Sequence, residues 1–243
     1  MEEKVNHAKE LIRQTIEQYN RVAIACSFGK DSMTIVHLAK QVDPTIKVFS
    51  IMTVYKPKET FEYLYFTNRK MNLNTTVYIV APTIPEELQD KFLKVVKLPY
   101  EEFDRKAREI ESQTGMPIYQ ANPDECCHLL KVEPTKVAVK DLDAWICGLR
   151  STEGRTRTNY QEVEDKGGLI KVNPILTWTE AEVWRYIATR GITPHPWYRK
   201  GYRSLGCAPC SNPGGEFERD GRWEGTSKCG GECGIHTKNL KNT

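Results

Sequence analysis

The sequence lacks long hydrophobic runs, since no apolar stretch approaches the roughly 20 residues that a membrane-spanning helix requires. Its first residues, MEEKVNHAKELIRQ, predict a polar amphipathic helix rather than a signal peptide. Neither charge predominates, because 35 Lys and Arg residues stand against 32 Asp and Glu residues and both signs are scattered. These absences exclude a role that depends on bulk charge. We therefore expect a cytoplasmic protein with no membrane partner and no nucleic-acid partner.

The sequence also lacks internal repeats and low-complexity tracts, and its 243 residues are enough for one large domain with a buried core. Cysteine is the informative component. The eight cysteines are unevenly spaced, at Cys26, Cys126, Cys127, Cys147, Cys207, Cys210, Cys229 and Cys233. In a reducing compartment, such clusters indicate metal binding or catalysis more often than structural disulfides.

Apolar strands alternate with helical patterns in the first third of the chain. Predicted strands cover residues 22–27, 47–53 and 75–81, and a helix is predicted after the first strand with Ser32 as its N-cap. A second helix is predicted near residues 59–71. Because strands that alternate with helices form parallel sheets covered on both faces, we expect an α/β fold with a doubly wound, mostly parallel sheet flanked by helices.

The remainder of the chain is less regular. Residues 84–118 are charged and helical in period, which predicts a segment peripheral to the sheet. Residues 144–149 predict a further buried strand, and Thr179 with Glu182 marks the start of a helix. We expect residues 1–195 to form the α/β nucleotide-binding domain. Residues 196–243, rich in Gly, Pro and Cys, should be an irregular segment that a ligand, a metal or the domain itself keeps in place.

The stretch SFGKDS, residues 27–32, lies at the carboxyl end of the first predicted strand and at the start of a helix. Backbone N–H groups and the helix dipole favour an anion at that place. Gly29 allows close approach of a phosphate, Ser27 and Ser32 add hydroxyl groups, and Lys30 adds charge. A tight turn with a helix cap would use the same residue types, so both interpretations stay open. The spacing is not that of a Walker A loop.

SFGKDS resembles the PP-loop, S-x-G-x-D-S, of the adenine-nucleotide α-hydrolase superfamily, with Asp31 at the position of the motif aspartate. The resemblance implies that the phosphate or sulfate end of an adenine nucleotide lies over this loop. Its binding residues would be Ser27, Gly29, Lys30, Asp31 and Ser32. The motif is shared by enzymes that cleave ATP to pyrophosphate and by users of adenylyl sulfate.

Two groupings of the cysteines can be drawn from spacing. CCHLLK begins with the pair Cys126 and Cys127, and GCAPC contains Cys207 and Cys210 in a C-x-x-C turn. Together these four thiolates would satisfy either a Zn²⁺ ion or a [4Fe-4S] cluster. The second grouping joins Cys207 and Cys210 to Cys229 and Cys233 in the tail, which would be a structural zinc ribbon. Spacing alone leaves both open.

Five further motifs follow the PP-loop in a fixed order: ANPDECCHLLKVEP, WICGLRSTEGRTR, YRSLGCAPC, RDGRW and ECGIH. This combination, which extends from Val22 to His236, resembles the assimilatory adenylyl-sulfate / phosphoadenylyl-sulfate reductase family. The resemblance is to its iron–sulfur branch, which mostly uses adenylyl sulfate. It implies that the [4Fe-4S] ligands are Cys126, Cys127, Cys207 and Cys210. It also implies that Cys233 is the catalytic nucleophile, with His236 as its catalytic neighbour.

The resemblance implies a thiol-dependent enzyme of sulfate assimilation. It would reduce adenylyl sulfate, or also 3′-phosphoadenylyl sulfate, to sulfite and AMP through an S-sulfonate on Cys233, and thioredoxin or a glutaredoxin-like protein would be the reductant. The substrate oxyanions need converging cations. Matching the family motifs gives Lys131, Arg150, Arg157, Arg219 and Arg222. A homo-oligomer is compatible with the resemblance.

Three departures keep other functions open. The complete PP-loop also suits an ATP pyrophosphatase that acts in sulfur transfer. The segment IMTVYKPKET lacks the Asp-Thr-Gly that often follows the second strand in this family, which bears on nucleotide selectivity. Cys229 has no counterpart in the family pattern, and it is either a resolving thiol for Cys233 or a thiol without a role. If the tail is a zinc ribbon, the protein is a binding module with a nucleotide-type fold.

Overall fold

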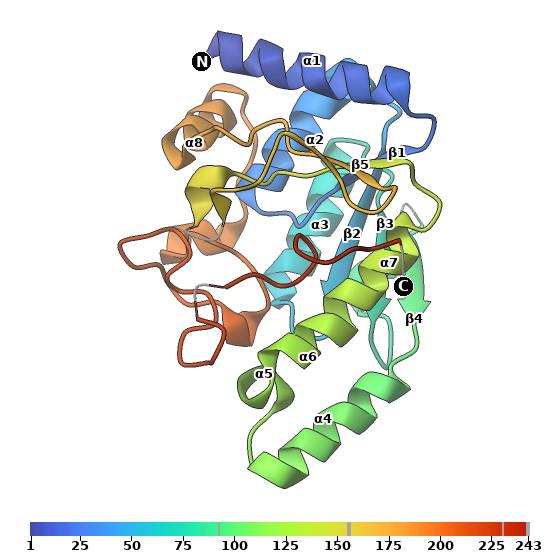
Figure 1. Ribbon diagram of the computed structural model, residues 1–243, viewed down its shortest axis with the longest axis vertical. Helices are drawn as coiled ribbons and strands as arrows, with labels where there is room; N and C mark the ends of the chain where they lie inside the picture. The colour runs from blue at the N-terminus through green and yellow to red at the C-terminus, as the bar shows by residue number, and fades with distance from the viewer. Residues whose placement is uncertain (92, 155–156, 230, 242–243) are drawn as a thin grey trace.

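The computed structural model describes residues 1–91, 93–154, 157–229 and 231–241. In this part of the chain, a seven-stranded sheet has the order β4-β3-β2-β1-β5-β7-β6 (Figure 1). Every neighbouring pair is parallel except β6 and β7, which form an antiparallel edge. The strands are β1 (Val22–Ala25), β2 (Lys47–Thr53), β3 (Thr76–Val80), β4 (Lys94–Leu98), β5 (Ala144–Ile146), β6 (Val163–Asp165) and β7 (Ile170–Val172).

Helices cover both faces of this sheet. Their bounds are α1 (Glu2–Gln18), α2 (Lys30–Val42), α3 (Lys58–Lys70), α4 (Glu101–Thr114), α5 (Ile118–Ala121), α6 (Pro123–Cys127), α7 (Glu133–Val139) and α8 (Glu180–Thr189). The largest apolar core lies between the sheet and α1, α2, α3 and α8. A second core lies on the other face, where α7 packs on β1, β2 and β5. The predicted fold class, a doubly wound and mostly parallel α/β sheet, is confirmed.

The order of the strands reverses between β1 and β5. The chain proceeds from β1 outward to β4 and then returns to place β5 on the other side of β1. In such sheets the crevice beside the carboxyl ends of these two strands is the usual ligand site. Gly148, just after β5, lies so close to α2 that a Cβ atom there would be 2.7 Å from the backbone of Asp31. The absence of a side chain at this position allows the chain after β5 to lie against the first turn of α2.

Two predictions about local structure were wrong. Helix α2 begins at Lys30 with Gly29 as N-cap, so Ser32 lies in its first turn, where its hydroxyl donates to the Gly29 carbonyl at 3.0 Å. Residues 84–118 are not all peripheral, because they contain the edge strand β4, which pairs with β3. Its KVVKL sequence has lysines at both faces and only partial burial, so its apolar alternation is weak. The capping box of Thr179 and Glu182 is confirmed.

The segment after Pro194 is irregular, as predicted, apart from short 3₁₀ turns such as Pro196–Lys200 and Ala208–Cys210. This segment packs against the domain, since Leu240 is buried in the second core with Trp145 and Val132. Figure 1 shows this segment, in orange and red, passing along the body of the protein beside α6 and α7. None of the helices in the described residues combines the length and the apolar composition that a membrane crossing would need.

Candidate active site

A cavity that is open to solvent lies at the carboxyl ends of β1 and β5. Residues far apart in the sequence meet in it. From the predicted set, its lining includes Ser27, Gly29, Lys30, Asp31, Ser32, Lys131, Arg157, Arg219, Arg222, Cys233 and His236. The predicted PP-loop, the basic motifs and the tail cysteine therefore share one cavity, whereas Arg150 lies fully buried behind it.

The PP-loop is held in a constrained shape. Phe28 has a positive φ of 63°, which is uncommon for a residue with a side chain, and its buried ring packs edge-on against Tyr63. This bend turns the chain from β1 into α2, and Gly29 follows as the N-cap. The Ser27 and Ser32 hydroxyl groups lie 3.2 Å apart across the loop. The backbone N–H of Lys30, the first of the helix, donates to the Tyr198 hydroxyl at 2.7 Å.

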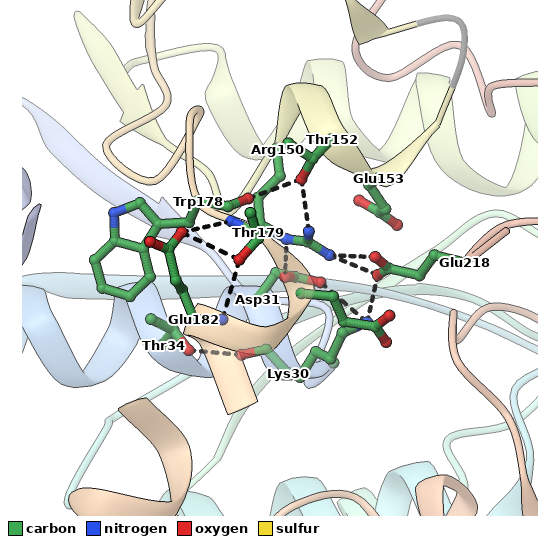
Figure 2. A network of polar contacts seen from close by, with 12 residues as sticks. Lys30, Asp31, Thr34, Arg150, Thr152, Glu153, Trp178, Thr179, Glu182 and Glu218 are labelled. Carbon is green, nitrogen blue, oxygen red and sulfur yellow. Dashed lines mark hydrogen bonds and ion pairs between the residues drawn. The ribbon is translucent and has the colours of Figure 1, made fainter. Parts of the chain in front are cut away.

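The side chain of Lys30 is turned into the protein. Its Nζ donates to the Arg203 carbonyl at 2.7 Å and forms an ion pair with Glu218 at 2.5 Å. Arg150 joins the same network, with Nε at 2.5 Å from Asp31 and Nη2 at 2.6 Å from Glu218 (Figure 2). Both cations lie where the motifs put them, beside the loop, but carboxylates already neutralise them.

Arg157 and Arg219 are paired in the same way. Arg157 contacts Glu153 and donates from Nε to Glu232 at 2.6 Å, while Arg219 lies 3.2 Å from Glu153. The carboxylates raise the pKa of Arg157 against the opposing effect of its burial. Oxygen atoms of Asp31, Glu153 and Glu218 lie within 4.8 Å of one another, but the four cations surround them. We therefore do not assign a metal ion to these carboxylates.

Three other cations in the cavity have different neighbours. Lys56, Lys131 and Arg222 interact electrostatically with one another and with cysteine sulfurs, and in the described ranges none of them forms an ion pair with Asp or Glu. Arg222 lies over the Trp223 ring at 4.4 Å and donates to the Cys210 carbonyl at 3.1 Å. Burial, helped by the other two cations, lowers the pKa of Lys56 to about 8. An anion that binds in this cavity would therefore interact with the unpaired positive charges of these three residues.

Lys56 was missed by the motif comparison. It lies a few residues after β2, in the segment that lacks the expected Asp-Thr-Gly, so no motif pointed to it. Its position was nevertheless a usable signal, because the carboxyl end of β2 lies next to that of β1 in a parallel sheet. Gly206 shows how closely this group is packed, since a Cβ atom there would lie 2.2 Å from the guanidinium of Arg222.

Cys233 lies at this cationic end of the cavity. Its sulfur interacts electrostatically with Lys56, Lys131, Arg157 and Arg222. Four cations therefore face one partly buried sulfur.

His236 lies deeper in the same cavity. It is stacked against Trp145 with ring centroids 6.0 Å apart, and its Nδ1 has no partner in the described part of the chain. Burial, together with Lys171 and Arg157, holds the pKa of His236 well below its ordinary value. A neutral imidazole can form hydrogen bonds but supplies no charge, so the positive surroundings of Cys233 come from Lys and Arg.

The four predicted ligand cysteines also meet. All four are buried and line one small cavity next to the active-site cavity. Cys126 and Cys127 lie at the end of α6, and Cys207 and Cys210 lie around a 3₁₀ turn. The turn is fixed to the end of β2, because the Ala208 N–H donates to the Tyr55 carbonyl at 2.7 Å. This quartet is a sulfur-only donor set, which is the kind that iron–sulfur clusters and structural zinc require.

The spacing of these sulfurs can be compared with that of a zinc site. Thiolates bound at about 2.3 Å to a single zinc ion would lie about 3.8 Å from one another. In the described residues, no three cysteine sulfurs lie within 4.8 Å of one another. The four sulfurs therefore lie farther apart in this structure than the ligands of a bound zinc ion would. Cys229 is exposed and lines neither cavity, so the zinc-ribbon grouping of tail cysteines is not assembled.

Comparison with known proteins shows the family of this chain. Residues 21–213 match the family model described as the phosphoadenosine phosphosulfate reductase domain. The adenosine 5′-phosphosulfate reductase of Lysinibacillus sphaericus is 30% identical over 97% of this chain and 93% of its own length. That of Bacillus cereus is 31% identical, over 97% of this chain and 92% of its own length. The crystal structure of a phosphoadenylyl-sulfate reductase from Candida auris, in a phosphate complex, shares the fold with a TM-score of 0.64 and 20% identity. That match covers 83% of this chain and 88% of the other.

Proposed function

Because this chain belongs to the phosphoadenosine phosphosulfate reductase domain family, we propose that it reduces adenylyl sulfate to sulfite and AMP. One observation carries the proposal. Cys233 lies beside Lys56, Lys131 and Arg222, the cations of the cavity that have no carboxylate partner in the described residues. A nucleophilic sulfur and free positive charge thus meet where a phosphate–sulfate anion can bind.

The three cations would bind the phosphate and sulfate oxygens of the substrate. Two of them are held in place before the substrate arrives, since Arg222 is packed between Gly206 and Trp223 and the Lys131 Nζ lies 5.8 Å from the centroid of the Trp223 ring. Preorganised charge of this kind stabilises the charge that develops on a leaving phosphate. Because Arg150, Arg157 and Arg219 are already paired, we assign them to positioning the cavity wall rather than to binding the anion directly.

The reaction would take place in two displacements. The Cys233 thiolate attacks the sulfate sulfur, an S–S bond forms, and the bond between that sulfur and the phosphate oxygen breaks, so that its electron pair leaves with AMP. The product on the enzyme is Cys233–S–SO₃⁻. A thiolate of a dithiol reductant then attacks the Cys233 sulfur and releases sulfite. Its second thiol resolves the mixed disulfide and restores the Cys233 thiolate, so the reductant supplies both electrons.

Cys126, Cys127, Cys207 and Cys210 would hold a [4Fe-4S] cluster. Their common cavity, their burial and the wide spacing of their sulfurs support this choice over zinc. When bound, the cluster would engage the four sulfurs as thiolates and add a fixed charge next to Lys131. Side chains of this chain would exclude water from the cluster, because Tyr55 and Tyr119 complete the wall of the cavity.

Residues 196–243 would work as a part of this site and not as a separate module. They supply Cys207, Cys210, Arg222 and Cys233 to a cavity whose floor belongs to residues 1–195. The reductant we propose is a thioredoxin or glutaredoxin-like protein, which must reach the S-sulfonate on Cys233. Cys229, exposed on the same segment, would be accessible to such a dithiol protein.

The test is to detect the intermediate. The protein, purified without oxygen, is mixed with adenylyl sulfate, and its intact mass is measured before and after addition of reduced thioredoxin. We expect one added SO₃ unit, located on Cys233 by peptide mapping, which thioredoxin removes as sulfite. Cys229→Ser is the matched control and should still form the adduct, whereas Cys233→Ser should not. An unmodified wild-type protein, or an adduct on another cysteine, would contradict the proposal.

A further inference from the structure

Helices α6 and α7 belong to one continuous run of helix that contains a single wider turn (Figure 1). The residues between the two helices, His128–Val132, form a turn of π-helix. At the end of this turn the N–H of Glu133 donates to the carbonyl of His128, five residues back, whereas an α-helix would use the residue four back. The π turn therefore holds one residue more than an α turn, a feature that is frequent at functional sites.

Pro134 gives a physical reason for the wider turn. In an α-helix, the residue at position 134 would donate its N–H to the carbonyl of Leu130, but proline has no N–H and its ring would clash with that carbonyl. A turn of five residues before the proline relieves this clash. Thr135 supports the same turn, because its buried hydroxyl group donates to the carbonyl of Lys131 at 2.6 Å.

The side chains of this turn are buried on several sides of the helix. Leu129, Leu130, Lys131 and Val132 are all buried, although four successive residues of an α-helix cover about 300° of its circumference. Leu129 and Leu130 pack in an apolar cluster with Phe103 of α4, and Val132 belongs to the second core. Among the described residues, Lys131 alone lines both the active-site cavity and the small cavity of the sulfur quartet.

The direction of the Lys131 side chain depends on the extra residue. Each residue of an α-helix advances by about 100°, so a turn that closed at four residues would rotate Lys131 by roughly that angle relative to one of its flanking helices. Neither flanking helix is free to follow. The cysteines at the end of α6 face the rest of the quartet, and Val139 of α7 is buried in the second core.

We propose that Pro134 is a positioning residue that directs Lys131 into the active-site cavity by keeping the turn before it open at five residues. Pro134 lines neither cavity, so it acts through the helix and not by contact with a ligand. This inference rests on the proposed function, because it takes Lys131 to bind the substrate anion. Its consequence is that a change at Pro134 weakens anion binding and leaves the sulfur quartet intact.

The test is a double-mutant cycle, measured by calorimetric titration of the anaerobically purified protein with AMP, an unreactive ligand. Pro134→Ala supplies an N–H for the Leu130 carbonyl, so the turn closes and Lys131 leaves the cavity. We expect the Kd for AMP to rise about tenfold, as when one charge-assisted hydrogen bond is lost. Lys131→Met should raise it by a similar factor. The double variant should bind AMP no more weakly than Lys131→Met alone, because residues that act as one unit are not additive.

Iron content is measured on the same samples and should equal the wild-type value in Pro134→Ala. The matched control is Pro117→Ala. Pro117 is the N-cap of the short helix α5 and lines neither cavity, and a residue at that position donates no N–H to the helix. This variant should therefore keep both the iron content and the Kd for AMP of the wild-type protein.

Four results would overturn the inference. They are an unchanged Kd in Pro134→Ala, a double variant in which the two losses add, a loss of iron in a folded Pro134→Ala protein, and a weakened affinity for AMP in Pro117→Ala. If Pro134→Ala does not fold, Thr135→Val decides. It keeps the proline and removes the hydroxyl contact with the Lys131 carbonyl, so the Kd for AMP should rise several-fold, and an unchanged Kd would contradict the role of the turn.

Failure of the inference and failure of the proposed function can be told apart. If Pro134→Ala binds AMP like the wild-type protein while the S-sulfonate still forms on Cys233, the inference alone is refuted. If the wild-type protein binds no AMP and forms no S-sulfonate, the proposed function is refuted.

Discussion

Arg157 ties the carboxyl-terminal segment to the body of the protein through Glu232, the residue immediately before Cys233. Its Nε donates to Glu232 Oε1 at 2.6 Å and its Nη2 to Glu232 Oε2 at 3.1 Å, a two-point contact between a planar guanidinium and a carboxylate. Both side chains are more than nine-tenths buried, with 6% and 7% of their surface exposed. The contact therefore holds Cys233, the proposed nucleophile, at the cationic end of the cavity.

Glu232→Gln should slow the formation of the S-sulfonate. Glutamine keeps the shape and one acceptor but removes the charge, so the two-point contact weakens and Cys233 is held less well. We expect the single-turnover rate to fall about tenfold, in keeping with the loss of one charge-assisted hydrogen bond. Rapid mixing followed by mass spectrometry measures this rate. Glu224→Gln, an exposed change on the same segment, should leave it unaltered.

Lys56→Met should weaken substrate binding more than turnover. Removing one of the three free cations costs a charge-assisted contact with the substrate anion, so the KM for adenylyl sulfate should rise about tenfold to a hundredfold. Lys56→Arg should restore part of the loss because it restores the charge. Lys58→Met is the control, since Lys58 pairs with Glu62 and Glu87 at the surface. Equal KM values for wild-type and Lys56→Met proteins would remove Lys56 from the binding site.

The cysteines should separate into two groups when iron is measured. Serine at Cys126, Cys127, Cys207 or Cys210 should abolish or greatly lower iron content and visible absorbance, because each supplies one sulfur to the shared cavity. Cys229→Ser and Cys233→Ser should retain both. Zinc in place of iron in anaerobically purified protein, or loss of iron in Cys233→Ser, would contradict this division.

Acid should destabilise the protein partly through His195. Burial, and then Lys56, lowers the pKa of His195 from 6.5 to about 4. The unfolded chain binds this proton more readily, so stability is intact above pH 6.5 and falls as the pH drops toward 4. The contribution of this group is about 3 kcal/mol at the low end.

The corresponding variant is His195→Asn. Asparagine can still accept the Trp197 N–H at the start of the 3₁₀ turn but does not titrate. Urea unfolding between pH 4 and 7 should show a shallower loss of stability for the variant than for the wild-type protein. Parallel curves would show that the His195 imidazole does not contribute.

Much of the framework of the site was predictable from local pattern. Strand, loop and helix alternation places SFGKDS beside a strand end, and the capping box at Thr179 is a purely local signal. The edge strand β4 was not predictable in the same way, because its KVVKL sequence buries neither face fully and its pairing with β3 is a tertiary event.

The pairing of cations with carboxylates was the larger feature that the sequence did not predict. A motif shows that Lys30 and Arg150 are cations, but it does not show that Glu218 neutralises both, since the partners are 188 and 68 residues apart. The same holds for Tyr198, whose hydroxyl reaches a loop 168 residues away. Motif resemblance therefore indicated many residues that line the cavity, but it missed Lys56 and could not separate the free cations from the paired ones.

The position of Glu218 bears on how the protein is made. A ribosome completes the sheet, with Lys30 and Arg150 at its centre, well before it adds the carboxylate that both of them contact. Until then the two cations have Asp31 as their shared partner at the heart of the nascent domain. The positive charge of Lys30 and Arg150 is therefore balanced by Glu218 only once the Glu218 segment has packed against them. Docking of that segment would complete both the buried charge network and the cavity wall.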